Sequence, residues 1–177
     1  RVTTLAGGGS GLPSIDGIGT DASFNSPYGV AYSPDGRYIA VADNNNHKIR
    51  LINVATTRVT TLAGSGSGTY THGVGTAASF YFPNHVAYSP DGRYIVVADN
   101  TNHRIRLINV ATTQVTTLAG SGSFDYANGV GTAASFKNPA GVAYSPDGRY
   151  IAVADQGYHK IRLINVATTK VTTLAGG

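Results

Sequence analysis

Three histidines are the residues whose type and spacing could support acid–base chemistry. His47, His103 and His159 each follow an aspartate by four residues, in the stretches DNNNH, DNTNH and DQGYH. An Asp–His pair can orient a general base, and three histidines around one axis could bind a metal ion. The pair recurs in every copy of a repeated unit, however, and the serine nearest in frame lies at the opposite end of that unit. We therefore expect a hydrogen-bonded structural brace, with no catalytic residue, no metal site and no cofactor.

The repeated unit is long enough to form one supersecondary structure. Residues 1–57, 58–113 and 114–169 align end to end, and the stretch VTTLAG occurs a fourth time, at residues 2–7, 59–64, 115–120 and 171–176. A period of this length with strand-like content is typical of propeller blades and not of helical solenoids. The chain is therefore expected to be a single repeat domain, residues 1–177, of the all-β class.

Each unit predicts four short antiparallel strands. In the first copy these are residues 29–33, 38–43, 48–54 and 59–64, and Pro34 with Asp35-Gly36 supplies the first tight turn. A long Gly/Ser-rich connection then leads to the next unit, and its stretch IDGIGTD is expected to be a flexible loop. The expected blades cover about residues 29–64, 85–120 and 141–176, with the VTTLAG strand outermost and residues 1–7 forming an extra outer strand.

Specific motifs in these units resemble a known family. VADNNNHKIRLIN, VADNTNHRIRLIN and VADQGYHKIRLIN, at residues 41–53, 97–109 and 153–165, each follow SPDGRY and precede VTTLAG. They resemble the blades of NHL-repeat β-propellers, and GVGTAASF resembles the long connection of one version of that repeat. The resemblance implies a propeller that is typically six-bladed and serves as a binding platform for protein or RNA, with hydrolases and lyases as distant relatives.

Three blades are too few to close a ring, because propellers typically have 4–8. We expect each open end to be lined by residues such as Tyr38, Val41, Ile49 and Leu51 or their repeats. A homodimer would complete six blades and bury on the order of 2,000 Å² or more. Residues 2–6 and 171–176 then compete for one outer position, so one of them should be displaced, and the short loop of the local hairpin favours the C-terminal one.

The repeats differ mainly at one end of the blades. Differences between the second and third copies fall in the long connection, at residues 68–72 and 81–85, and in the turn between the second and third strands, at residues 100–102. These loops define a variable face. SPDGR and NVATT, which are identical in all copies, define a constant face.

Aromatic and small polar residues on the variable face are typical of a recognition surface for a protein or peptide, and less so for RNA. The alternative is that these loops have drifted and their aromatics pack onto the frame. The candidate binding residues are Tyr28, Tyr70, Tyr81, Phe82, His85, Phe124, Tyr126, Lys137, Asn138 and Tyr158.

Composition narrows the function classes. The 177 residues are 41% hydrophobic and 12% charged, and a net charge of +4 is scattered over the units, which disfavours nucleic acid. The absence of cysteine excludes disulfides and thiol chemistry, and no apolar run is long enough to predict a membrane span. The chain begins at Arg1, so we expect a processed or excised piece. Near-identical repeats without methionine suggest an engineered or recently amplified protein.

Three hypotheses remain for the function. The first is a non-enzymatic structural scaffold that self-assembles into a closed propeller. The second is a binding platform that uses the variable face. The third, a relative of hydrolases or lyases, is disfavoured because the acid–base candidates belong to the repeated frame.

Overall fold

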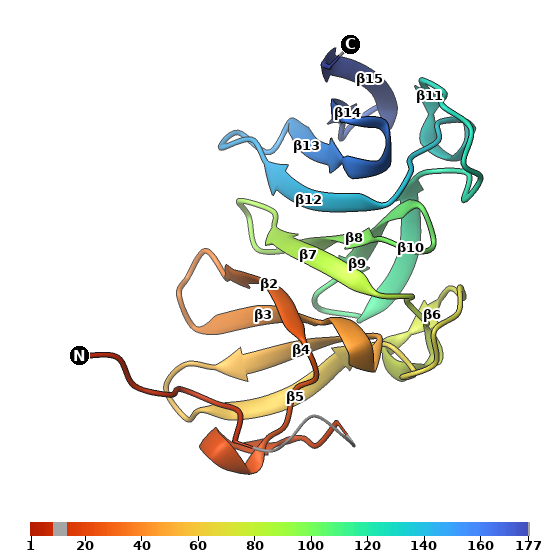
Figure 1. Ribbon diagram of the computed structural model, residues 1–177. Coiled ribbons are helices and arrows are strands. Elements are labelled where there is room, and N and C mark those ends of the chain that lie inside the picture. Colours follow the sequence, from red (N-terminus) through yellow and green to blue (C-terminus); the bar gives the residue numbers. More distant parts are fainter. Residues whose placement is uncertain (9–13, 177) are drawn as a thin grey trace.

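The computed structural model describes residues 1–8 and 14–176 and shows three antiparallel sheets that follow one another along the chain (Figure 1). We call these sheets blades 1, 2 and 3. Blade 1 contains β1 (Gly17–Ile18), β2 (Pro27–Tyr32), β3 (Tyr38–Asp43), β4 (Lys48–Asn53) and β5 (Arg58–Ala63). Blade 2 contains β6 (Gly73–Val74), β7 (Pro83–Tyr88), β8 (Tyr94–Asp99), β9 (Arg104–Asn109) and β10 (Gln114–Ala119). Blade 3 contains β11 (Gly129–Val130), β12 (Pro139–Tyr144), β13 (Tyr150–Asp155), β14 (Lys160–Asn165) and β15 (Lys170–Ala175).

Each blade has five strands where the sequence predicts four. The order in blade 1 is β1-β5-β4-β3-β2, and the other blades repeat it. The prediction that the VTTLAG strand is outermost is therefore wrong, because the long connection folds back and Gly17 pairs with Val59. The stretch IDGIGTD, expected to be a flexible loop, forms β1 and the 3₁₀ turn η1 (Gly19–Asp21).

The turn of the constant face explains why SPDGR recurs unchanged. Ser33 Oγ donates to Asp35 Oδ1 at 2.6 Å, and the same oxygen accepts the Arg37 N–H at 3.1 Å. Gly36 has a φ of 70°, a conformation that side chains disfavour. The turn is therefore complete within each blade and requires no neighbour.

The hydrophobic core lies between the blades. One cluster joins Ala40 and Ile49 of blade 1 to Val86 and Ile95 of blade 2, and a second joins blade 2 to blade 3. The strand YIVVAD of blade 2 (β8) is apolar on both sides because this blade is covered by a neighbouring blade on each face. The inner strands β2, β7 and β12 lie side by side (Figure 1).

The two terminal VTTLAG segments differ in structure. β15 pairs with β14 in a local hairpin, with Val171 opposite Ile164. Residues 1–8 contain no strand, and Val2 is 99% exposed. Of the two competing segments, the N-terminal one is therefore unpaired in the single chain.

Candidate functional site

A buried Arg–Asp pair anchors the variable face in every blade. Asp99 ends β8, and Arg106 Nη1 from β9 donates to its Oδ2 at 2.9 Å, with both side chains fully buried. The equivalent distances are 2.8 Å for Arg50–Asp43 and 2.9 Å for Arg162–Asp155. Burial raises the pKa of Asp99 in spite of the lowering effect of Arg106.

The sequence predicts a brace between the aspartate and the histidine of each copy, and this prediction is wrong because the two side chains bind different partners. The aspartate binds arginine, whereas the histidine occupies a left-handed turn position, with a φ of 55° at His47, and points to the next blade. His47 Nδ1 accepts the N–H of Phe82 at 3.1 Å, and His103 Nδ1 accepts the N–H of Asn138 at 3.0 Å. His47 and His103 therefore each connect two neighbouring blades.

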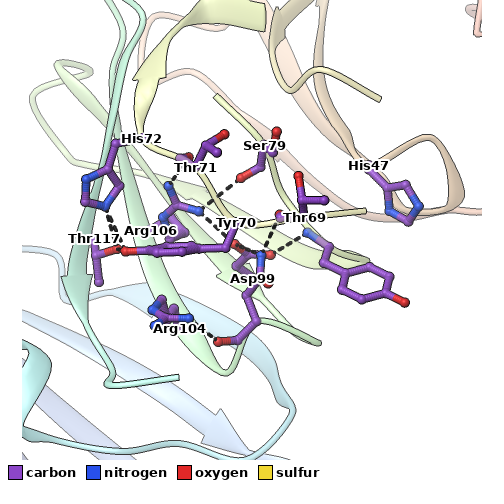
Figure 2. Close-up of polar contacts among 12 residues, drawn as sticks. His47, Thr69, Tyr70, Thr71, His72, Ser79, Asp99, Arg104, Arg106 and Thr117 are labelled. Carbon is purple, nitrogen blue, oxygen red and sulfur yellow. Dashed lines mark hydrogen bonds and ion pairs between the residues drawn. The ribbon is translucent and has the colours of Figure 1, made fainter. Parts of the chain in front are cut away.

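Two of the candidate tyrosines cover the buried arginines. The Tyr70 ring lies 3.9 Å from the guanidinium carbon of Arg104 and 4.7 Å from that of Arg106 (Figure 2). The Tyr70 hydroxyl contacts His72 Nε2 and Thr117 Oγ1, each at 2.9 Å. Tyr126 repeats this arrangement over Arg162 at 4.9 Å, and its hydroxyl contacts Thr173.

His72 belongs to the same group of side chains. Its Nε2 lies 3.0 Å from Thr117 Oγ1, and burial together with Arg106 and Arg104 lowers its pKa (Figure 2). The equivalent residues Asp16 and Asn128 contact the matching threonines of blades 1 and 3. The variable loop thus supplies a different polar group to the same frame position in each blade.

A second set of candidates lies at the junctions between blades. The Tyr81 and Phe82 rings stack at 5.0 Å, and His47 of blade 1 meets Phe82 edge-on at 4.7 Å. At the next junction Phe124 lies 4.6 Å from His103 and is 65% exposed, and Asn138 Nδ2 donates to Asn100 Oδ1 at 3.3 Å.

The remaining candidates lie in separate places. Tyr28 is on the inner strand β2 and is 67% exposed, and His85 is half-buried on β7. Lys137 Nζ lies 5.8 Å from the Tyr158 ring, which meets Tyr126 edge-on. The candidate residues therefore form several clusters along the variable face and do not line one pocket.

A hollow that the sequence analysis missed lies on the constant face between blades 1 and 2. Its volume is about 560 Å³, and Tyr38, Tyr88 and Asp91 are among its lining residues. Burial, with the nearby Asp35 and Tyr38, raises the pKa of Tyr88 to about 12. The signal for this hollow was the tyrosine that flanks each side of SPDGR in every copy.

The open ends of the array expose residues that are buried elsewhere in the repeat. Val30 is 59% exposed, whereas its equivalents Val86 and Val142 are 0% and 4% exposed. At the other end Leu174 is 63% exposed, against 8% for Leu62. Ile161 is 41% exposed, and its equivalents Ile49 and Ile105 are fully buried.

The expectation that Val41 lies exposed at an open end is wrong. Val41 is 3% exposed and packs in a cluster that includes Ala22, with Phe24 against it. These residues of the long connection cover the outer part of the blade 1 face, so its exposed part lies on the inner strand, at Val30 and Tyr32.

Within residues 1–8 and 14–176, no group of three or more His, Cys, Asp or Glu side chains is arranged to bind a metal ion. The same part of the chain has no helix of the length and hydropathy needed to cross a membrane.

Similarities to known proteins cover nearly the whole chain. The chain is 32% identical over 166 residues to the chloroplastic protein SUPPRESSOR OF QUENCHING 1 of Arabidopsis thaliana, covering 92% of this chain and 16% of that protein. It is 33% identical over 105 residues to human NHL repeat-containing protein 2, covering 59% of this chain and 14% of the relative. The chain thus spans only a small part of the length of these relatives. No family model matches it.

Solved structures agree in fold. An auxiliary nutrient binding protein from Bacteroides ovatus superimposes with a TM-score of 0.65 at 18% identity, over 88% of this chain and 37% of that one. A chain of a nidogen/laminin complex gives 0.62 at 19% identity, over 84% and 48%. The recurring sheets, the sequence relatives and the shared fold together identify this chain as an NHL-repeat β-propeller array.

Proposed function

We propose that this chain is a non-enzymatic repeat scaffold that assembles as a homodimer, so that two copies of three blades form one closed ring of six. The observation that carries the proposal is the exposure of Val30, Ile161 and Leu174 at positions that are buried in the inner junctions. Each open end presents a surface that this chain already buries against another of its own blades.

Polar groups at the C-terminal end support the same partner. Asn44 and Asn100 each donate from Nδ2 to the carbonyl of a proline in the next blade, at 3.1 Å. In blade 3, Gln156 is the equivalent of these asparagines and His159 is the equivalent of His47 and His103; within the described residues His159 Nδ1 has no partner. In a second copy, the Pro27 carbonyl is the equivalent of the acceptor that Asn44 and Asn100 bind, and the Ser26 N–H is the equivalent of the donor that binds His47 and His103.

The number of blades favours two copies over other closed assemblies. Rings typically contain 4–8 blades, and among multiples of three only six falls in that range. A two-fold assembly forms two identical new junctions, each between blade 3 of one copy and blade 1 of the other.

The mass of the chain in solution tests this proposal. We expect light scattering at micromolar concentration to give twice the chain mass, and Leu174→Asp or Ile161→Asp to give the monomer because each places a charge inside the new junction. Val130→Asp is the matched control: Val130 is 58% exposed, and its equivalents Ile18 and Val74 are 50% and 54% exposed, so no junction covers this position. A folded wild-type monomer, or equal effects of all three variants, would overturn the proposal.

The non-enzymatic part of the proposal is supported by how the acid–base candidates are used. Asp43, Asp99 and Asp155 each bind a buried arginine, and His47 and His103 accept backbone N–H groups. These side chains therefore form structural ion pairs and hydrogen bonds within and between the blades. Turnover of a phosphate or carboxylic ester that disappears with His85→Ala would contradict this assignment.

A second candidate function is protein or peptide binding at the variable face. It is supported by the exposed rings of Phe124 and Tyr28 and by the fold shared with a chain of a nidogen/laminin complex. Peptides selected from a random library on the wild-type protein should lose about tenfold or more in affinity for Phe124→Ala or Tyr28→Ala. Selected peptides that bind both variants equally well would remove this candidate.

A further inference from the structure

Residues 2–8 form the N-terminal segment. The end of this segment is hydrogen-bonded to blade 1 in a manner that recurs at both inner junctions. The Gly7 N–H donates to the Gly19 carbonyl at 3.0 Å, and the Gly8 N–H donates to the Ala22 carbonyl at 3.2 Å. The equivalent bonds are Gly64 to Gly75 at 3.2 Å, Ser65 to Ala78 at 2.8 Å, Gly120 to Gly131 at 3.2 Å and Ser121 to Ala134 at 2.8 Å. In those cases the donors directly follow the VTTLAG strands β5 and β10 of the preceding blade.

The rest of the N-terminal segment lacks the strand neighbour that its sequence has elsewhere. Val2 is 99% exposed, whereas its equivalents Val59, Val115 and Val171 are fully buried. Ala6 packs against the cluster that contains Ala22, much as Ala63 shares a cluster with Ala78. The segment therefore has the end of a VTTLAG strand in place, but it lacks the neighbouring strand, equivalent to β4, with which it would pair.

In the closed ring proposed above, the blade that precedes blade 1 is blade 3 of the second copy. Its VTTLAG strand β15 ends directly before Gly176, whose φ of 105° matches the 108° of Gly64 and the 107° of Gly120. By equivalence, Gly176 of the second copy donates to the Gly19 carbonyl. The N-terminal segment and β15 of the second copy thus require the same acceptor.

The turn before β15 decides between the two strands. Thr168 donates from its N–H and its hydroxyl to Asn165 Oδ1, both at 3.0 Å, and the Val166 N–H donates to the Arg149 carbonyl at 2.9 Å. Release of β15 would break its pairing with β14 and free the turn that Asn165 and Thr168 form, and the N-terminal segment brings no turn to replace it. Withdrawal of the segment, by contrast, gives up a bond to Gly19 that Gly176 of the second copy forms again.

We infer that the N-terminal segment occupies, in the single chain, the place that the end of β15 of a second copy takes in the ring, and so competes with dimerisation. The inference rests on the proposed homodimer. Because the segment must leave before the second copy can bind, the apparent affinity of the dimer equals the intrinsic affinity multiplied by the fraction of molecules in which the segment has left.

Removal of residues 1–7 tests the competition. We expect the dissociation constant of the dimer, measured by sedimentation over a dilution series, to fall by about tenfold for each of the two junctions. Gly7→Val keeps the full length and should act in the same direction, because a Cβ at Gly7 would lie 3.0 Å from the Phe24 ring. Gly92→Val is the matched control: its φ is also positive, at 72°, and the added Cβ would lie 3.6 Å from Pro34 Cδ, an ordinary contact in the inner junction between blades 1 and 2, which the single chain and the ring share.

Each other result of this experiment overturns the inference in a distinguishable way. If truncation weakens the dimer, the N-terminal segment completes the partner blade in place of β15. If truncation leaves the dissociation constant unchanged, the segment has no part in the junction. In both cases the homodimer stands, whereas wild-type and truncated chains that are both monomeric would refute the homodimer itself.

Discussion

The buried Arg–Asp pair of blade 2 gives the most direct prediction about stability. Arg106 donates to Asp99 at 2.9 Å, to the Ser79 carbonyl at 3.1 Å and to the Thr71 carbonyl at 2.9 Å (Figure 2). Arg106→Met keeps much of the side-chain volume and leaves Asp99 buried without its cation. Removing one partner of a buried ion pair costs about 3–5 kcal/mol, and we expect the free energy of unfolding to fall by that amount.

The pH dependence of this loss identifies its cause. Burial raises the folded-state pKa of Asp99, and loss of Arg106 removes the nearest charge that opposes the shift. Between the unfolded value of about 3.9 and this raised value, the folded state binds more protons, so stability falls as pH rises through that window. The deficit of Arg106→Met should therefore be smaller at about pH 5 than at neutral pH.

Urea unfolding followed by circular dichroism, at one protein concentration, measures both effects. The control is the double variant Asp99→Asn/Arg106→Met, in which the buried group is neutral and still accepts the Tyr81 N–H. We expect it to recover part of the lost stability. If the double variant is as unstable as Arg106→Met and the deficit is the same at both pH values, the lost packing of Arg106 is the cause and the argument from buried charge is refuted.

Three further predictions concern the frame. Gly64→Ala should destabilise the protein more than Gly36→Ala in thermal unfolding, because both have positive φ but the Cβ at Gly64 would lie 2.5 Å from the His47 carbonyl oxygen. Hydrogen bonds from Ser89 and from the Arg93 N–H lower the pKa of Asp91, so Ser89→Ala should raise that pKa in a carboxyl NMR titration. Since a lowered folded-state pKa gives stability that is lost as pH falls through it, Ser89→Ala should also lose less stability in acid than the wild type. Burial raises the pKa of Tyr88 and Tyr144 to about 12, so ultraviolet titration should show a late phase that Tyr88→Phe/Tyr144→Phe removes.

The sequence predicted the strands well where local signals determine them. The apolar run of residues 38–43 and the turns on either side match β3, and the same holds in each copy. The two-residue strands β1, β6 and β11 could not be predicted, because two residues show no periodicity. Their position depends on the return of a long loop to β5, which is a tertiary effect.

The Asp–His prediction failed because sequence spacing does not reveal which side chains share a face. Asp43 and Arg50 meet because the β3–β4 register places Arg50 opposite Val41, two residues before Asp43 on the same strand. A usable signal was present: an arginine inside the apolar strand KIRLIN must be buried, and a buried arginine requires an anionic partner. Asp43, at the end of the preceding strand, was the nearest candidate.

The sequence was sufficient to locate the variable face, but it did not show which side chains on that face pack together. The substitutions in the repeats identify the loops, yet whether Tyr70 is free or lies over Arg104 depends on the side-chain packing. Phe124, which is 65% exposed, and Tyr70, whose ring lies over Arg104, have the same signature in a sequence comparison.

Three near-identical blades separate what a blade does alone from what its neighbours contribute. The Ser–Asp turn bond is 2.6 Å in every copy, so it belongs to the blade itself. The burial of the position shared by Ile49, Ile105 and Ile161 is lost only where no blade follows, so it belongs to the junction. Stability in such arrays is approximately a sum of these two contributions. Each separate chain has two inner junctions, so two chains have four in total, whereas a closed ring has six. Association would therefore supply a third of all junctions in the ring. Folding and assembly should then be strongly linked, and the melting temperature of the wild type should rise with protein concentration while that of Leu174→Asp should not.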